Sequence, residues 1–98
     1  MSATERLCIV CYDVRHPRRW RRLFRIMKGY GEWLQLSVFQ CRLDAQRRVT
    51  LEAELTEVIR AGEDHVLIID IGPADQVAPR FHSLGQAFDP LERGPMIV

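Results

Sequence analysis

The chain has 98 residues, of which 47% are hydrophobic and 28% are charged. That length fits one domain with a single core and excludes a second domain, and the composition excludes a disordered chain. No apolar run reaches the roughly 18 residues that a membrane-spanning helix needs, and the polar N-terminus is unlike a secretory signal, so we expect a cytoplasmic protein.

The net charge of +1 conceals a strong polarity along the chain. Up to Arg48 there are eleven basic and four acidic residues, a balance of +7; from Val49 onward there are three basic and nine acidic residues, a balance of −6. Half of all Lys and Arg residues lie between Arg15 and Lys28, with no acid among them. This distribution predicts one face that attracts polyanions.

The first predicted element is a central strand. Leu7–Tyr12 (LCIVCY) is a short apolar run rich in β-forming residues, which predicts a strand covered on both faces. Cys8 and Cys11 would then point to opposite faces, so their CxxC spacing indicates small buried hydrophobes rather than a zinc or redox site.

A basic helix and a second extended segment follow. Pro17 suits the first position of a helix, and apolar residues recur at helical spacing until glycines stop the pattern. The next segment, Trp33–Leu43, alternates apolar and polar residues but changes phase, which predicts a kink, a bulge or a very tight turn near residues 37–39. The apolar positions of the helix are Trp20, Leu23, Phe24, Met27 and Tyr30, and the glycines are Gly29 and Gly31.

The second half predicts one more helix and one more strand. Asp44 is the expected N-cap of a helix over residues 45–61, and His65–Ile71 (HVLIIDI) reads as the last core strand. Residues 72–94 contain three prolines and only a weak helical signal over 77–84. The resulting order, βαββαβ, predicts an α+β domain. The residues expected to face inward from the second helix are Val49, Leu51, Leu55, Val58 and Ile59.

Asp13 is the most suggestive single residue for chemistry. It is a carboxylate at the point where a buried strand ends, which is a common place for ligand contacts in α/β folds. It could hold Mg²⁺; alternatively, it caps the turn into the first helix by accepting hydrogen bonds from amides near Arg15 and His16. A symmetric dimer would supply two copies of Asp13, and two carboxylates with a divalent ion could activate water against a phosphodiester.

The arginines of the first helix suit phosphate contacts, because a guanidinium is a forked and permanently charged donor. The alternative is a solvated helix surface, although such surfaces usually mix charge signs. Ser37 could bind a phosphate or satisfy a distorted backbone. Among the histidines, His16 could carry a proton or cap the helix, whereas His65 and His82 look incidental. The basic residues are Arg15, Arg18, Arg19, Arg21, Arg22, Arg25 and Lys28.

These pieces together resemble the family of CRISPR-associated protein two, the small subunit of the spacer-acquisition machinery. The resemblance rests on an apolar strand that ends in Tyr12-Asp13, a basic helix, the segment QLSVF at residues 35–39, a second amphipathic helix and the strand HVLIID. It covers about the first 72 residues in order and spacing, and SVF is its most specific part. The terminal MIV resembles the family's last strand.

The resemblance implies a ferredoxin-like fold in a single domain, residues 1–98, with a core over 1–72 and an irregular segment over 73–98 whose last strand crosses to the partner in a homodimer. It implies a DNA-binding scaffold that pairs with the CRISPR integrase on duplex DNA. The expected nucleic-acid-binding residues are Arg15, Arg18, Arg19, Arg22, Arg25 and Ser37, and the expected dimer contacts are Phe39, Met96, Ile97 and Val98.

The family also suggests an enzyme. Several members are described as Mg²⁺-dependent endonucleases of single-stranded RNA or duplex DNA, so the resemblance implies one Mg²⁺ per dimer, shared by the two Asp13 carboxylates as catalytic metal ligands. Gln40 stands where many members carry an acid after SVF, which removes one source of a second carboxylate. A toxin-type ribonuclease of the virulence-associated protein D group is a weaker alternative with the same fold and the same early aspartate.

Overall fold

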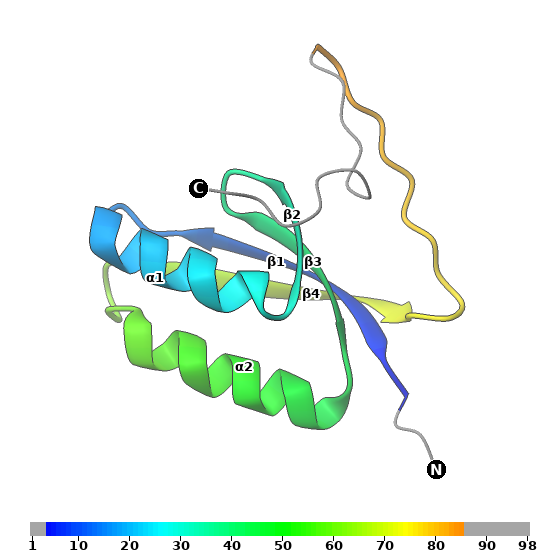
Figure 1. Ribbon diagram of the computed structural model, residues 1–98, viewed down its shortest axis with the longest axis horizontal. Coiled ribbons are helices and arrows are strands. Elements are labelled where there is room, and N and C mark those ends of the chain that lie inside the picture. Colours follow the sequence, from blue (N-terminus) through cyan, green and yellow to red (C-terminus); the bar gives the residue numbers. More distant parts are fainter. Residues whose placement is uncertain (1–3, 86–98) are drawn as a thin grey trace.

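The computed structural model describes residues 4–85, and its elements follow the predicted order. They are β1 (Arg6–Asp13), α1 (Pro17–Lys28), β2 (Gly31–Gln35), β3 (Val38–Leu43), α2 (Ala45–Val58) and β4 (His65–Pro73). The strands form one antiparallel sheet in the order β2-β3-β1-β4 (Figure 1). Each helix therefore connects two strands that are separated by one other strand, which is the connectivity of a ferredoxin-like α+β sandwich.

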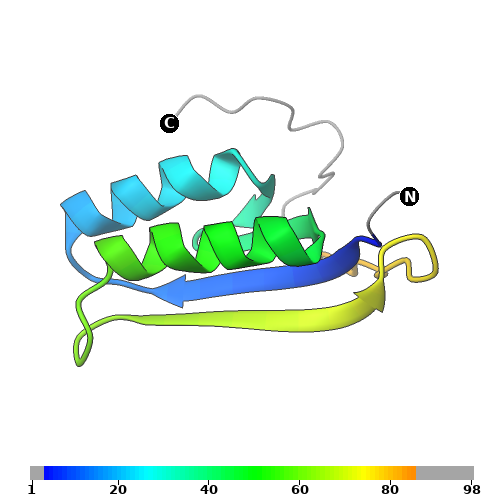
Figure 2. The same cartoon turned by 90° about the horizontal axis from the view of Figure 1, so that it is seen from below.

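Both helices lie on the same face of the sheet, as Figure 2 shows. Cys8, Val10 and Tyr12 of β1 belong to the buried core on that face. Cys11 points to the other face and is only half-buried, which confirms that the two β1 cysteines diverge. The prediction that this strand is covered on both faces was wrong for the described part of the protomer, because both helical crossovers pack on one side.

The helix ends follow from local hydrogen bonds. Asp44 caps α2 as predicted, since its Oδ1 accepts from the amide of Arg47 at 2.7 Å. Helix α2 ends three residues earlier than predicted, because Ile59 is extended at φ −72° and ψ 156°. Val49 is 64% exposed and not inward-facing as predicted. Its position, two residues before the buried Leu51, is about 200° around the helix and faces solvent.

The predicted phase change is a tight hairpin turn at Leu36 and Ser37 between β2 and β3. Leu36 has a positive φ of 38°, which is uncommon for a leucine. Two tryptophans hold the turn: Trp33 Nε1 donates to the Leu36 carbonyl at 3.0 Å, and Trp20 Nε1 donates to Ser37 Oγ at 2.7 Å. The Ser37 carbonyl also accepts from the Tyr12 amide at 3.1 Å. The turn is therefore fixed to both α1 and β1.

Phe39 corrects one prediction. Its side chain is 0% exposed and packs inside the protomer between the rings of Tyr12 and Phe24, so it has no surface left to contact a partner copy. The turn reverses the phase of the chain and sends Phe39 to the helix-covered face.

The segment after β4 has no helix within residues 74–85, so the weak helical signal is not realised in that part. The amide of Ala74 donates to the carbonyl of Glu5 at 2.8 Å and extends the β1–β4 edge. The expected dimer contacts Met96, Ile97 and Val98, and the crossing strand that they would form, lie outside the described residues. No helix in the described part of the chain is long and apolar enough to cross a membrane.

Candidate functional site

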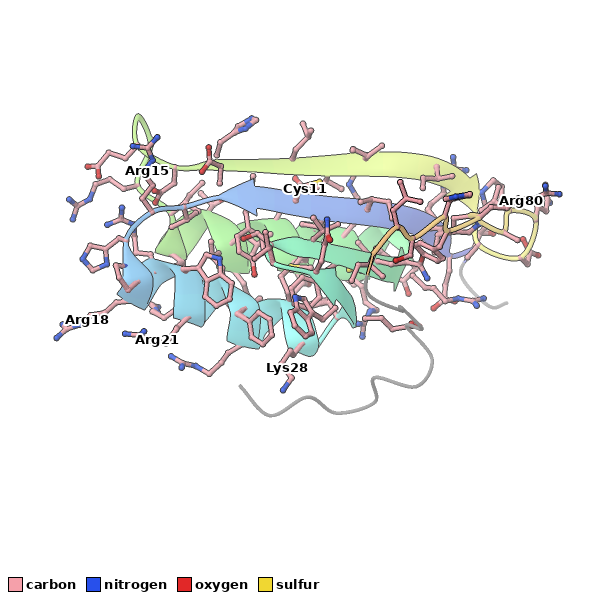
Figure 3. All side chains as sticks on the ribbon, turned by 90° about the horizontal axis from the view of Figure 1, so that it is seen from above. Cys11, Arg15, Arg18, Arg21, Lys28 and Arg80 are labelled. Atoms are coloured by element: carbon pink, nitrogen blue, oxygen red, sulfur yellow. The ribbon has the colours of Figure 1, made fainter. Side chains whose placement is uncertain are left out.

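A strip of unpaired arginines runs from the end of β1 along α1. All five are exposed, and their guanidinium groups make no hydrogen bond or ion pair with any residue in the described part of the chain. Figure 3 shows Arg18, Arg21 and Lys28 projecting from α1, with Arg15 near the turn that leads into the helix. No carboxylate interrupts the strip, so its field is of one sign. The five residues are Arg15, Arg18, Arg21, Arg22 and Arg25.

The strip borders a pocket of about 470 Å³ between the start of α1 and the end of α2. Its charged lining includes Arg18, Arg22 and Arg60, with Glu57 as its acid. Sequence reasoning missed Arg60, because this residue lies in the loop after α2 and comes close to α1 only through the fold. The remaining lining residues are His16, Arg19, Val58 and Ile59.

Arg19 also lines this pocket, but its guanidinium forms an ion pair with Asp64 inside the protein. Its Nε donates to Asp64 Oδ2 at 2.7 Å and its Nη2 donates to Asp64 Oδ1 at 3.2 Å. The Asp64 side chain is only 1% exposed and also accepts from the backbone amide of Arg60 at 2.8 Å. The hydrogen bonds from Arg19, followed by that from the Arg60 amide, hold the pKa of Asp64 below its ordinary value. Arg19 therefore ties α1 to the start of β4.

Ser37 is likewise occupied by the fold, since its hydroxyl accepts from Trp20 and its carbonyl accepts from Tyr12. His16 is the N-cap of α1, and its Nδ1 accepts from the Arg18 amide at 3.2 Å. Of the residues expected to bind nucleic acid, the structure leaves the guanidinium groups of Arg15, Arg18, Arg22 and Arg25 free within the described part of the chain. It gives Arg19 and Ser37 structural partners.

Asp13 is exposed at the last position of β1. It does not cap α1, because His16 does so, and its carboxylate has no hydrogen-bonding or ionic partner among residues 4–85. Within those residues, no group of three or more His, Cys, Asp or Glu side chains could hold a metal ion. One protomer thus supplies a hard oxygen donor of the kind Mg²⁺ prefers, and further donors would have to come from a second copy or from water.

On the sheet face opposite the helices, β1 and β4 present apolar side chains. Leu67 and Ile69 of β4 are 48% and 43% exposed, and they lie directly across from Cys11 and Ile9 of β1. Side chains that face each other across antiparallel strands share a face. We call this set, Ile9, Cys11, Leu67 and Ile69, the open face; Asp13 lies at its edge.

A profile of the family described as "CRISPR associated protein Cas2" matches residues 6–77, which contain every strand and helix of the described chain. The chain belongs to the Cas2 family. The Cas2 match confirms the resemblance seen in the sequence.

Relatives in the Cas2 family align over nearly the whole chain. "CRISPR-associated endoribonuclease Cas2" of Geobacter sulfurreducens is 56% identical over 94 residues, covering 96% of this chain and 99% of its own. "CRISPR-associated endoribonuclease Cas2 1" of Rhodospirillum rubrum is 50% identical over 97 residues, covering 99% of this chain and 95% of its own.

Solved Cas2 structures have the same fold. A crystal structure titled as Cas2 superposes with a TM-score of 0.74 at 29% identity, covering 97% of this chain and 100% of that chain. Streptococcus pyogenes Cas2 superposes with a TM-score of 0.70 at 28% identity, covering 81% of this chain and 99% of that chain.

Proposed function

We propose that this Cas2 family member is a homodimeric nucleic-acid-binding subunit that works in the cytoplasm with a CRISPR integrase to insert new spacers. The observation that carries the proposal is the strip of unpaired arginines on α1. Free guanidinium groups can each take a phosphate, often through two parallel hydrogen bonds. A row of them along one helix follows a polyanionic backbone without reading its sequence.

The pocket at the end of the strip supports the same proposal. Arg18 and Arg22 lie one helical turn apart on α1 and Arg60 comes from the loop after α2, so three arginines line one pocket. The guanidinium of Arg60 also pairs with Glu63 at 3.5 Å. The acid in that lining, Glu57, is exposed and leaves a net positive charge. A row of arginines suits duplex DNA, because several phosphates along its backbone can each be neutralised by one arginine. A small anion would need the pocket alone.

The open face supports the homodimer. Leu67 and Ile69 are exposed in the described part of the protomer, and Ile9 and Cys11 are only half-buried. Large apolar patches on a small protein usually mark an interface. We favour a second copy of this chain as the partner on the open face, because a two-fold axis would pack the same apolar patch of each protomer against the other. It would also bring the two Asp13 residues, at the edge of that patch, toward each other.

Size-exclusion chromatography with light scattering of this protein, the cognate CRISPR integrase and a short DNA duplex tests the proposal. We expect one stable complex that contains both proteins and the duplex, and a mass of two protomers for this protein alone. Absence of any complex with either component, in low as well as moderate salt, would contradict the scaffold role.

A second candidate function is a metal-dependent endonuclease that cleaves single-stranded RNA or duplex DNA. It is favoured by the exposed and unpartnered carboxylate of Asp13 and by the word endoribonuclease in the names of the Geobacter and Rhodospirillum relatives. Two Asp13 carboxylates from a dimer, completed by waters, would suit one Mg²⁺. When bound, such an ion would activate water and offset the charge that develops on a phosphodiester, while the arginine strip would hold the strand.

The test of this candidate compares Asp13→Ala with Asp75→Ala, an exposed aspartate in the segment after β4 that also lacks a partner in the described chain. Cleavage of labelled RNA and duplex DNA is followed with Mg²⁺ present. We expect Asp13→Ala to abolish cleavage and Asp75→Ala to retain it. Equal cleavage rates for the Asp13→Ala variant and the parent protein would exclude Asp13 as the catalytic ligand, and no cleavage by the parent protein would exclude the enzyme.

A further inference from the structure

His65, at the first position of β4, lies directly opposite Asp13 in the β1–β4 ladder. The two side chains therefore project from the same side of the sheet, the side that also carries Cys11 and Leu67, two residues further along the same ladder. Directly opposed residues in an antiparallel pair have Cβ atoms about 5 Å apart. The strand pairing thus brings together a carboxylate and an imidazole that are 52 positions apart in the chain.

The neighbour of His65 fixes this orientation. Asp64 points to the helix side, where Arg19 and the Arg60 amide bind its carboxylate. Val66, the next residue in β4, packs against the helix-side core. Successive side chains in a strand alternate between faces, so His65 points to the opposite side, the open face. Both backbones are held by the ladder and by this ionic anchor, and a site built on such rigid positions is well organised for a ligand.

The Asp13 carboxylate and the His65 imidazole are both exposed. Neither makes a hydrogen bond or an ion pair with any residue over 4–85. The fold therefore places two potential ligand groups side by side and uses neither of them for its own stability.

We propose that His65 joins Asp13 as a ligand of a divalent first-row transition metal ion at the edge of the open face. Ligand atoms lie about 2.0–2.2 Å from such an ion, so two side chains with Cβ atoms about 5 Å apart can share one. A carboxylate alone favours Mg²⁺, whereas an added imidazole favours ions such as Co²⁺. This inference extends the proposed function only in taking Asp13 as a metal ligand, and it requires neither cleavage nor DNA binding.

The experiment titrates the full-length protein with Co²⁺ and, separately, with Mg²⁺. Calorimetry measures the affinity of each ion, and NMR follows the ring protons of His65 and His82, which paramagnetic Co²⁺ shifts and broadens when it is close. The variants are His65→Asn, Asp13→Asn and the control His82→Asn, which changes an exposed histidine in the segment after β4.

We expect the His65 ring signals to respond at Co²⁺ concentrations that leave those of His82 unchanged. We also expect His65→Asn to weaken Co²⁺ binding by at least about tenfold and to change Mg²⁺ binding much less. The control His82→Asn should bind Co²⁺ with the affinity of the parent protein. Equal responses of the two histidines in the parent protein, or native Co²⁺ affinity in His65→Asn, would overturn the proposal. Because none of these readouts involves nucleic acid, a protein without nuclease activity can still pass the test.

Discussion

Removing the two free arginines that the pocket shares with the strip is the sharpest test of the nucleic-acid surface. The double variant Arg18→Gln/Arg22→Gln keeps a polar side chain at both positions and removes two positive charges. Both residues are exposed and neither guanidinium has a partner in the described chain, so the fold should be unaffected. The expected result is weaker binding with a smaller dependence on salt.

The size of the effect follows from counterion release. Each guanidinium that neutralises a duplex phosphate contributes about −0.9 to the slope of log K against log salt concentration. Loss of two contacts should therefore make the slope shallower by about 1.8 for each bound protomer. If counterion release is the whole energy of these contacts, affinity at about 0.1 M salt falls by roughly 60-fold, and the difference vanishes as salt approaches about 1 M.

Fluorescence anisotropy with a labelled duplex, measured over a range of salt concentrations, gives both quantities. Arg80→Gln is the matched control, because Arg80 is exposed and lies at the end of the molecule opposite Arg18 (Figure 3). Arg19 is left intact, since its loss would release the buried Asp64 carboxylate and disturb folding. A double variant with the parent slope, or a control with the same loss, would refute the assignment of the duplex to this helix.

Three further predictions concern the parts that hold the site in place. Ser37→Ala removes the acceptor of Trp20 Nε1 and should lower the free energy of unfolding by about 1 to 3 kcal/mol in urea denaturation, and no loss would mean that this hydrogen bond does not hold the hairpin. The pKa of Asp64 is lowered from 3.8, so the stability it provides is complete above that value and is lost as the pH falls through the lower, folded-state pKa. Asp64→Asn should therefore make the melting temperature depend less on pH as the pH falls below about 5, and an unchanged profile would contradict the pairing. Gly31→Ala would bring its Cβ to 2.6 Å from a buried sulfur of β3, whereas Gly29→Ala meets its nearest atom at 3.3 Å, so thermal melts should show the larger loss for Gly31→Ala.

Residue periodicity was enough to predict the order of the elements and most of their inner faces. The β1 alternation separated Cys8 from Cys11 correctly, and Asp44 was recognisable as an N-cap from its position alone. Such patterns are local, because they depend on the repeat of a helix or strand. They do not reveal which face of a sheet is covered, so the open face was missed.

The features of the candidate site that the sequence did not reveal have the same origin. Arg19 looked like its neighbours on α1, and only the fold shows that Asp64, 45 residues later, takes its charge. No local pattern singled out Arg60 or His65. Arg60 lies in the pocket only because α1 and the end of α2 are neighbours in the fold, and His65 lies opposite Asp13 only because of the β1–β4 register. A pairing between strands that are distant in sequence cannot be read from composition or spacing.

The hairpin turn changes what the SVF signature can be taken to mean. Ser37 accepts the indole hydrogen of Trp20, Phe39 fills the core, and Leu36 before them adopts a backbone conformation that is held by Trp33. The residues of the SVF signature thus have structural roles in the hairpin and the core. Asp13 lies outside these residues, at the end of β1, so the SVF signature reports on the fold of the hairpin and not on nuclease activity.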